Sequence, residues 1–290
     1  MACDFQLKPL SLAPMHVPQS YIEESVHIAL TEDVGLEDVT SKLIPEDDFS
    51  IASVIVRENA IICGVDWFEE TFNQLDSEVF IEWNTDDGEA VTVDQQICTL
   101  SGSTRALLTG ERTALNFLQT LSGTATLAKQ YADAVAGTGT RILDTRKTIP
   151  GLRMAQKYAV SCGGCFNHRM GLYDAILIKE NHILSMGSIK DAVEAARINS
   201  PELPVEVEVE NIEEFEQALA AKVERVLLDN FNIEMLKQAV TINNKQIELE
   251  ASGGITLDNI RSIAETGVDY ISTGAITKDV KALDLSMRFS

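Results

Sequence analysis

Positive charge is scarce in this sequence of 290 residues. Lysine and arginine together number 23, against 45 aspartates and glutamates, which gives a formal net charge of −22. So acidic a chain repels phosphate backbones, and this excludes general nucleic-acid binding as its function. Long apolar runs are missing as well, since no uninterrupted hydrophobic segment reaches the length needed to span a bilayer.

The sequence also shows no sign of a disulfide framework or of a secretory signal. The five cysteines are an odd number spread over a long chain, which indicates reduced thiols. The first twenty residues lack the basic start and the apolar run that a signal peptide requires. We therefore expect a cytoplasmic protein.

The few cations are concentrated in one segment. Residues 141–179 hold seven lysines and arginines against two acidic residues, whereas residues 1–140 hold six against 23 and residues 180–290 hold ten against 20. A charge run is usually a solvated face. Here the cations are interleaved with glycine, cysteine, aromatic residues and apolar runs, which is typical of burial. A buried cationic cluster predicts an anionic ligand.

From about residue 141 the chain alternates short apolar segments with amphipathic ones. The apolar segments predict strands at 141–145, 174–180, 204–210, 224–230, 247–252 and 269–274. The amphipathic segments predict helices at 189–199, 211–221, 232–240 and 256–266. Alternation of this kind predicts a parallel sheet, and so many units without a glycine-rich dinucleotide loop favour closure into a barrel.

The first 110 residues follow a different pattern. Residues 21–30 predict a helix, and residues 50–64 and 78–102 predict antiparallel strands. The second of these strand segments is similar to a lipoyl-type hairpin, but no lysine stands at a turn to carry a prosthetic group, so we interpret it as structural. A helix beginning near Thr109 carries Arg112 away from its apolar face, where an arginine is typically an ordinary surface residue.

Barrel enzymes place their active sites at the carboxyl ends of the strands. That rule selects polar and small residues that follow six predicted strands, namely Arg146, Lys147, Lys179, Glu208, Asp229, Ser252, Gly253, Thr273 and Gly274. Alternation within residues 204–210 directs three valines toward the helices and Glu206, Glu208 and Glu210 into the barrel, where they need cations, a metal or ribose hydroxyls as partners. The alternative is an exposed edge strand with an acidic face.

Two glycine-rich turns, SGGI at 252–255 and STGAI at 272–276, follow the last two predicted strands. Small residues there let backbone N–H groups surround a phosphate. Lys179 permits a different chemistry, in which a desolvated lysine attacks a carbonyl as in a Schiff-base aldolase. The crowd of arginines favours anion binding, because guanidinium pairs with carboxylate through two hydrogen bonds.

Two further features of the cationic segment are ambiguous by themselves. Cys162-Gly-Gly-Cys165 has the spacing of a redox pair or of half a zinc site, but no second CxxC accompanies it, so we interpret it as a tight glycine turn with incidental thiols. A lone histidine such as His168 is more often structural than catalytic. Beside Arg146, Arg169 and Lys179, it joins a set able to hold more than one carboxylate.

The block from Asp144 to His182, with ERTALNFLQTLSGTAT before it and EVEVEN, LLDNF, EASGGI and STGAIT after it, closely resembles the quinolinate phosphoribosyltransferases, a type II phosphoribosyltransferase family. The resemblance covers nearly the whole chain. It implies an N-terminal α/β sandwich at 1–115 and an open TIM-like α/β barrel at 116–290, whose last residues return to the first domain. It also implies a homodimer or an assembly of dimers.

The implied reaction joins quinolinate to 5-phosphoribosyl 1-pyrophosphate with Mg²⁺, and gives nicotinate mononucleotide, pyrophosphate and CO₂ in NAD biosynthesis. Carried over by motif, the roles divide among three groups of residues. Quinolinate would contact Arg146, His168, Arg169 and Lys179, with Arg112 supplied by the neighbouring subunit and Thr145 and Arg153 beside them. Lys147, Glu208 and Asp229 would act on the phosphoribosyl donor, and the two carboxylates would also hold Mg²⁺. The 5′-phosphate of the donor would contact Ser252, Gly253, Gly254, Thr273, Gly274 and Ala275.

Two positions depart from the family pattern: Cys165 stands where a third glycine is usual, and Glu37 stands where a glycine is frequent. Neither changes a charged site residue. Three other functions stay open beside the implied one. They are a related transferase that uses nicotinate, a lysine aldolase acting through Lys179, and a non-catalytic sensor of phosphorylated ligands.

Overall fold

The computed structural model describes residues 14–290, which divide into two units. The N-terminal unit comprises residues 14–129, 148–164 and 277–290, and the barrel unit comprises residues 130–147 and 165–276. Cys3 and most of the twenty residues inspected for a targeting signal lie outside the described part. Across residues 14–290 no helix combines the length and the apolar character that a membrane crossing needs.

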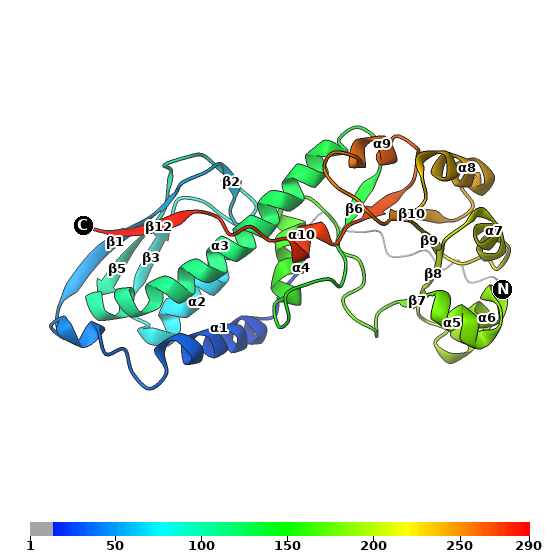
Figure 1. Cartoon of the computed structure of the whole chain (residues 1–290). Helices are drawn as coiled ribbons and strands as arrows, with labels where there is room; N and C mark the ends of the chain where they lie inside the picture. Colours follow the sequence, from blue (N-terminus) through cyan, green and yellow to red (C-terminus); the bar gives the residue numbers. More distant parts are fainter. Residues whose placement is uncertain (1–13) are drawn as a thin grey trace. The chain divides into compact units, whose positions relative to one another are not determined.

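The N-terminal unit is built on an antiparallel sheet of order β12-β1-β5-β3 (Figure 1). Its strands are β1 (Phe49–Val56), β3 (Phe80–Trp83), β5 (Gln96–Ser103) and β12 (Leu285–Phe289), and a separate pair joins β2 (Ala60–Ile61) to β4 (Ala90–Val91). β12 comes from the end of the chain and pairs with β1. The antiparallel strands expected from the sequence are confirmed.

The helices of this unit are α1 (Gln19–Val34), α2 (Val65–Leu75), α3 (Thr104–Ala134) and α4 (Arg153–Cys162), with a 3₁₀ turn at Ser41–Leu43. α2 and α3 pack on the sheet, and α1 and α4 pack on α2 and α3 in a second cluster. Phe68 and Phe72 of α2 and Leu115 and Leu118 of α3 pack on the inner face of the sheet. Each such side chain contributes roughly 2 to 3 kcal/mol by leaving water.

The barrel unit contains six parallel strands in the order β6-β11-β10-β9-β8-β7. They are β6 (Arg141–Leu143), β7 (Ile176–Ile178), β8 (Val205–Val209), β9 (Arg225–Asp229), β10 (Glu248–Ser252) and β11 (Tyr270–Ser272). All six match strands expected from the sequence. In the described residues β6 and β7 are not paired with each other, so the sheet is an open barrel, with one further bridge from Leu143 to Phe166.

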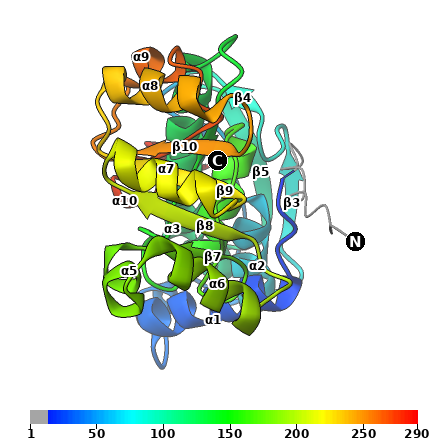
Figure 2. The same cartoon turned by 90° about the vertical axis from the view of Figure 1, so that its right-hand side faces the viewer.

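Helices lie over the outer face of this sheet, as Figure 2 shows for α5 to α9. They are α5 (Glu180–Met186), α6 (Ile189–Asn199), α7 (Ile212–Ala220), α8 (Ile233–Asn243) and α9 (Ile260–Ala264), followed by α10 (Ala275–Lys278). Ser188, Asn211 and Asn232 begin α6, α7 and α8 by accepting a backbone N–H three residues on. These capping residues fix where each helix begins, within one residue of the start expected from the sequence.

Candidate active site

The carboxyl ends of β9 and β10 bring together residues that are far apart in the sequence. Asp229 pairs in register with Ser252, and the N–H of Asn230 donates to the carbonyl of Ser252 at 2.9 Å. Gly253 has a φ of 96°, and a β-carbon there would lie 2.2 Å from Oδ1 of Asn230. Only glycine lets this turn approach the neighbouring strand end so closely.

The ends of β6 and β11 form the next part of the same edge. A β-carbon on Gly274 would lie 2.8 Å from Cδ of Lys147 and 3.3 Å from Oγ1 of Thr145, so the lysine chain lies against the glycine turn. The N–H of Thr273 donates to the carbonyl of Leu143 at 3.1 Å. The N–H of Ala275 donates to Oγ1 of Thr273 at 3.2 Å. A cation and an expected phosphate-binding turn are thus neighbours.

Lys179 and Glu208 meet at the ends of the adjacent strands β7 and β8, where the lysine Nζ contacts the carboxylate. Glu208 also lines a cavity of about 580 Å³ beside α5, together with Glu180, Glu210 and Glu214. The pairing keeps a carboxylate and an ammonium together at the strand ends. Either group can be released to a ligand of the opposite charge.

Arg146 and Arg169 of the barrel unit influence each other electrostatically. Arg169 is partly buried and donates from Nη1 to the carbonyl of Ala175 at 3.2 Å. Burial lowers the pKa of Arg169, and the charge of Arg146 lowers it further. Like charges held together in a half-buried position favour an anion between or beside them.

Asp144 fixes the segment that carries His168 and Arg169. Its side chain is fully buried, and its carboxylate accepts from the N–H of His168 at 2.8 Å and from Nδ2 of Asn167 at 2.7 Å. The segment also contacts β6 through the bridge at Phe166. Gly164, with a φ of 85°, takes the turn before it, so Cys165 at the next position does not disturb the turn geometry.

His168 is directed at two carboxylates inside the barrel. Nε2 lies 3.1 Å from Oε2 of Glu206 and 3.5 Å from Oε2 of Glu250, while Nδ1 accepts the N–H of Arg169 at 2.7 Å. Burial alone would lower the pKa of His168, but Glu250 and Glu206 outweigh it and raise the pKa to about 8. The hydrogen bond that Nδ1 accepts opposes protonation of the ring, whereas the two carboxylates near Nε2 favour it.

Arg225, at the start of β9, completes this interior network. Its Nη2 donates to Oε2 of Glu248 at 2.9 Å, and its Nη1 lies 3.4 Å from Oε2 of Glu250. The guanidinium lies over the ring of Tyr270, 4.2 Å from the centroid. Burial would lower the pKa of Arg225, but Glu206 and Glu250 raise it. His168 and Arg225 together neutralise the buried carboxylates.

The titration of His168 gives a first prediction. Because its folded pKa of about 8 exceeds the unfolded value of 6.5, its contribution to stability is full below pH 6.5 and is lost as the pH rises through about 8. In ¹³C-histidine spectra of the folded protein, which has four histidines, we expect one resonance to titrate near pH 8. Glu250→Gln should lower that pKa toward the ordinary histidine range.

The matched control for this prediction is Glu248→Gln, which changes an acidic residue of the same strand that contacts Arg225 but is not paired with His168. It should leave the His168 titration close to that of the unchanged protein. Equal shifts from the two substitutions would show that net charge, and not contact, sets the pKa.

Two other expected site residues belong to the N-terminal unit. Arg112 is exposed on α3, and Arg153 begins α4, where its Nε donates to Oγ1 of Thr148 at 3.1 Å; both belong to the N-terminal unit, and their roles stay predictions. The expectation that Glu210 points into the barrel is wrong. β8 ends at Val209, so the alternation stops there and Glu210 is exposed. Glu206 and Glu208 are inside, as expected.

Sequence reasoning missed Asp144, Arg225 and Glu250 as functional residues. Glu250 follows the same alternation in β10 that identified Glu206 in β8, so an interior position was readable from the sequence. Asp144 is the conspicuous acid in a cationic segment. Arg225 opens its strand and carries no comparable local signal, because its partners come from β10.

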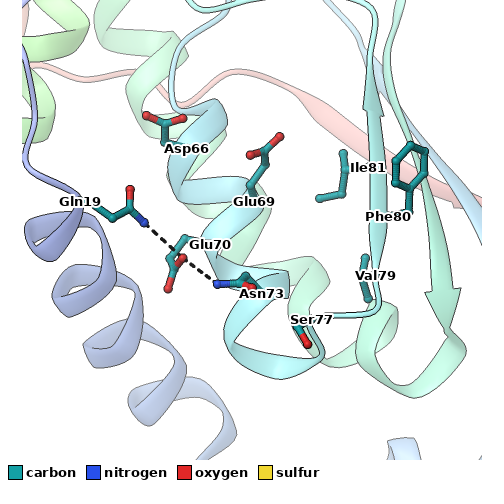
Figure 3. Close-up of a pocket in the computed structure, with 9 residues that line it drawn as sticks. All are labelled: Gln19, Asp66, Glu69, Glu70, Asn73, Ser77, Val79, Phe80 and Ile81. Carbon is teal, nitrogen blue, oxygen red and sulfur yellow. Dashed lines mark hydrogen bonds between the residues drawn. The ribbon is translucent and has the colours of Figure 1, made fainter.

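A cavity of about 330 Å³ in the N-terminal unit has the wrong charge for an anion site (Figure 3). Asp66, Glu69 and Glu70 line it, and Glu70 accepts hydrogen bonds from Gln19 and Asn73. None of the residues selected from the sequence lines this cavity. The candidate active site is therefore the edge of the barrel unit described above.

A parallel α/β barrel with glycine-rich turns after its last two strands, and with lysine and arginine at the same edge, defines an enzyme class that acts on phosphorylated anionic small molecules. The family models for the N-terminal and C-terminal domains of quinolinate phosphoribosyl transferase match residues 38–122 and 124–288. The chain belongs to the quinolinate phosphoribosyltransferase family.

Individual relatives agree with this assignment. The chain is 41% identical over 273 residues to the nicotinate-nucleotide pyrophosphorylase (carboxylating) of Mycobacterium leprae. The aligned region covers 91% of this chain and 95% of the relative. The solved structure of the nicotinate-nucleotide pyrophosphorylase from Francisella tularensis has a TM-score of 0.93 and 48% identity, covering 95% of this chain and 98% of the other. The solved structure of human nicotinic acid phosphoribosyltransferase has a TM-score of 0.60 and 11% identity, covering 95% of this chain and 74% of the other. At this identity the similarity is one of fold only.

Proposed function

We propose that this protein transfers the phosphoribosyl group of 5-phosphoribosyl 1-pyrophosphate to quinolinate with decarboxylation. The products are nicotinate mononucleotide, pyrophosphate and CO₂, in NAD biosynthesis. The proposal is supported by basic side chains that follow the parallel strands: Lys147 lies against the turn at Gly274, and Lys179 contacts Glu208 where β7 and β8 end. The charge of Arg146 also acts on Arg169 in the same unit.

Electrostatics explains why this reaction needs such an edge. Quinolinate is a dianion and the phosphoribosyl donor carries more negative charge, so their approach is strongly repulsive unless fixed cations offset it. Arg146 and Arg169 suit the planar carboxylates of quinolinate, because guanidinium donates two parallel hydrogen bonds. His168 contributes by position, since its ring nitrogens already contact Glu206 and the Arg169 backbone.

The chemical step follows from the same residues. The ring nitrogen of quinolinate attacks the anomeric carbon, whose positive character Glu208 and Asp229 favour from the ends of β8 and β9. Lys147 stabilises the departing pyrophosphate. Attack makes the ring nitrogen cationic, and the adjacent carboxylate then leaves as CO₂ because the resulting carbanion lies next to that charge. The carbanion then takes one proton from water to give nicotinate mononucleotide. The protein orients both substrates, and no side chain is required as a dedicated acid.

Glu208 and Asp229 also fit a Mg²⁺ ion carried in with the donor. Both present carboxylate oxygens, the ligand type that Mg²⁺ prefers, at neighbouring strand ends. Lys179 already supplies a positive charge to Glu208 in this structure. When bound, Mg²⁺ would supply charge neutralisation of the pyrophosphate oxygens.

The direct test is incubation with quinolinate, 5-phosphoribosyl 1-pyrophosphate and Mg²⁺, following pyrophosphate and CO₂ together. Equal amounts of both products support the proposal. Turnover of nicotinate with no use of quinolinate would assign the chain to the nicotinate-using class instead. Binding of both ligands without pyrophosphate release would identify a sensor that has retained the fold.

The aldolase alternative rests on Lys179 alone. A Schiff-base lysine works best in an apolar pocket that disfavours its charge. Lys179 instead contacts the carboxylate of Glu208, and its side chain is 41% exposed. Borohydride treatment in the presence of carbonyl substrates should leave Lys179 unmodified, and a covalent adduct on it would revive this alternative.

We further propose a homodimer in which Arg112 reaches the active site of the neighbouring subunit. Arg112 is exposed, and large apolar side chains of the same unit are exposed with it, among them Leu36, Val39, Leu43 and Phe49. Such side chains favour an interface between copies. We also propose a cytoplasmic location, since the four described cysteines are free thiols.

Mixed subunits test the shared site. Arg112→Ala and Lys147→Ala proteins should each be inactive as homodimers. After denaturation and refolding together, we expect activity to return to about a quarter of the unmodified level, because half of the dimers are mixed and each has one intact site. Recovery no greater than the sum of the separate proteins would contradict an Arg112 contribution across the interface.

A further inference from the structure

Two cysteines and an aspartate of the N-terminal unit converge outside the site described above. Sγ of Cys63, Sγ of Cys162 and a carboxylate oxygen of Asp87 all lie within 4.8 Å of one another. Cys63 is fully buried, whereas Cys162 and Asp87 are partly exposed. We refer to these three residues as the thiol-carboxylate triad. The proposed transferase reaction uses none of them.

The fold builds the triad from three separate segments. Pairing of β2 with β4 continues past the strands, because the N–H of Ile62 donates to the carbonyl of Glu89 at 3.0 Å and Gly88 donates back to Ile62 at 2.8 Å. This places Cys63 beside Asp87. Cys162 is the last residue of α4, and a β-carbon on Gly88 would lie 3.5 Å from its carbonyl oxygen.

The backbone around the triad is held by further hydrogen bonds. Oγ of Ser122, on α3, accepts the N–H of Cys63 at 2.9 Å and donates to its carbonyl at 3.1 Å. Gly163, directly after Cys162, is so close to α3 that a β-carbon would lie 2.3 Å from the carbonyl of Ala125. The two thiol-bearing segments are therefore positioned independently of any bond between them.

Asp87 carries a charge that no cation of the described residues neutralises. Its carboxylate accepts from the N–H groups of Gly64 and Val65 at 2.9 and 3.1 Å and from the hydroxyl of Tyr158 at 2.8 Å. A bound cation would offset the charge of this carboxylate.

The donor atoms determine which cation fits. Two sulfurs and one oxygen suit a thiophilic ion, whereas Mg²⁺ and Ca²⁺ prefer oxygen ligands alone. Zinc bonds of about 2.3 Å to sulfur place tetrahedral thiolates about 3.8 Å apart. Separations within 4.8 Å need only a small movement to reach this geometry. The Tyr158 hydroxyl orients the third ligand, as outer hydrogen bonds commonly do.

We propose that Cys63, Asp87 and Cys162 bind one thiophilic divalent cation of the Zn²⁺ type, with a water as fourth ligand on the partly exposed side. Binding releases the two thiol protons to solvent, and no electron is transferred. The partner of Cys162 in this site is not Cys165, its neighbour in the CxxC spacing. The structure supplies Cys63, 99 residues away in the sequence, as the second sulfur.

The test uses the full-length protein, reduced with a phosphine and stripped of metal, titrated with Zn²⁺ and separately with Co²⁺. We expect one tight Zn²⁺ per chain and, with Co²⁺, a sulfur-to-cobalt charge-transfer band together with the visible bands of tetrahedral Co²⁺. Cys162→Ser and Asp87→Asn should each weaken Zn²⁺ binding at least tenfold, and Cys162→Ser should diminish the charge-transfer band.

Cys98→Ser is the matched control, because Cys98 is another buried free thiol of the same unit and is not part of the triad. It should bind both metals as the unmodified protein does. Far-ultraviolet circular dichroism checks that each variant folds, and Tyr158→Phe, which leaves all three ligands in place, should weaken binding less than Asp87→Asn.

Three results would overturn the proposal. They are Zn²⁺ affinity unchanged by Cys162→Ser in a folded protein, a Co²⁺ complex without the charge-transfer band, and failure of the reduced protein to bind Zn²⁺. In the last case a Cys63–Cys162 disulfide, detected by mass spectrometry after mild peroxide treatment, would assign the pair to redox chemistry instead.

Discussion

We expect Arg169→Ala to lower kcat/KM for quinolinate by roughly 10²- to 10³-fold, mainly through a higher KM. The guanidinium is partly buried, and the charge of Arg146 acts on it, so under the proposed function its loss would remove about 3 to 4 kcal/mol of charge-assisted binding to a carboxylate. Arg169→Lys keeps the charge but loses the planar pair of donors, so its kcat/KM should lie between those of the unmodified protein and of Arg169→Ala. Steady-state kinetics with quinolinate varied at saturating phosphoribosyl donor measure the effect.

Arg197→Ala is the matched control for this prediction. Arg197 also donates to backbone carbonyls, those of Ala221 and Lys222, but it lies on α6 away from the strand ends. Its loss should change kcat/KM less than twofold. An Arg169→Ala protein that is folded and retains the KM for quinolinate would remove Arg169 from the substrate site.

We expect Arg225→Met to destabilise the barrel unit by about 3 to 5 kcal/mol. The substitution leaves Glu250, which is fully buried, and Glu206 with only His168 to offset their charge. Removing one partner of a buried ionic network costs this much because the remaining charge has no solvent. Hydrogen exchange of amides in β9 and β10 reports the opening free energy of this unit by itself.

The control for the network is Arg261→Met, which breaks an exposed pair with Glu265 on α9 and should cost less than about 1 kcal/mol. Adding Glu250→Gln to Arg225→Met should recover part of the loss, since it removes the stranded charge. A loss of stability from Arg225→Met as small as that from Arg261→Met would contradict this account. It would mean that the interior carboxylates are protonated when Arg225 is absent.

Much of the barrel unit could be predicted because its rules are local. The strands from β6 to β11 are short segments that are apolar or alternate apolar with polar residues, and each is followed by polar or small residues that the barrel geometry places at one edge. Alternation in β8 indicated that Glu206 and Glu208 lie inside, because side chains of a strand point to opposite faces in turn. These two patterns predict the site residues at the strand ends, whereas the substrate contacts of His168 and Arg169 are implied by the family resemblance.

What could not be predicted depends on contacts between distant segments. The pairing of Arg225 with Glu248 and Glu250 requires the register of β9 against β10, which neither strand encodes alone. The approach of Cys63 to Cys162 requires the ends of a strand pair and of a helix to meet. The prediction that Glu210 points into the barrel was wrong for a local reason, because β8 ends one residue before it.

A crystal structure with quinolinate bound is the most direct test that the cations of the barrel edge form one anion site. We expect both carboxylates of quinolinate to lie within hydrogen-bonding distance of basic side chains, with Arg169 holding one of them through two nitrogens. Quinolinate bound elsewhere, with Arg146 and Arg169 contacting only solvent, would contradict the assignment of this edge as the active site.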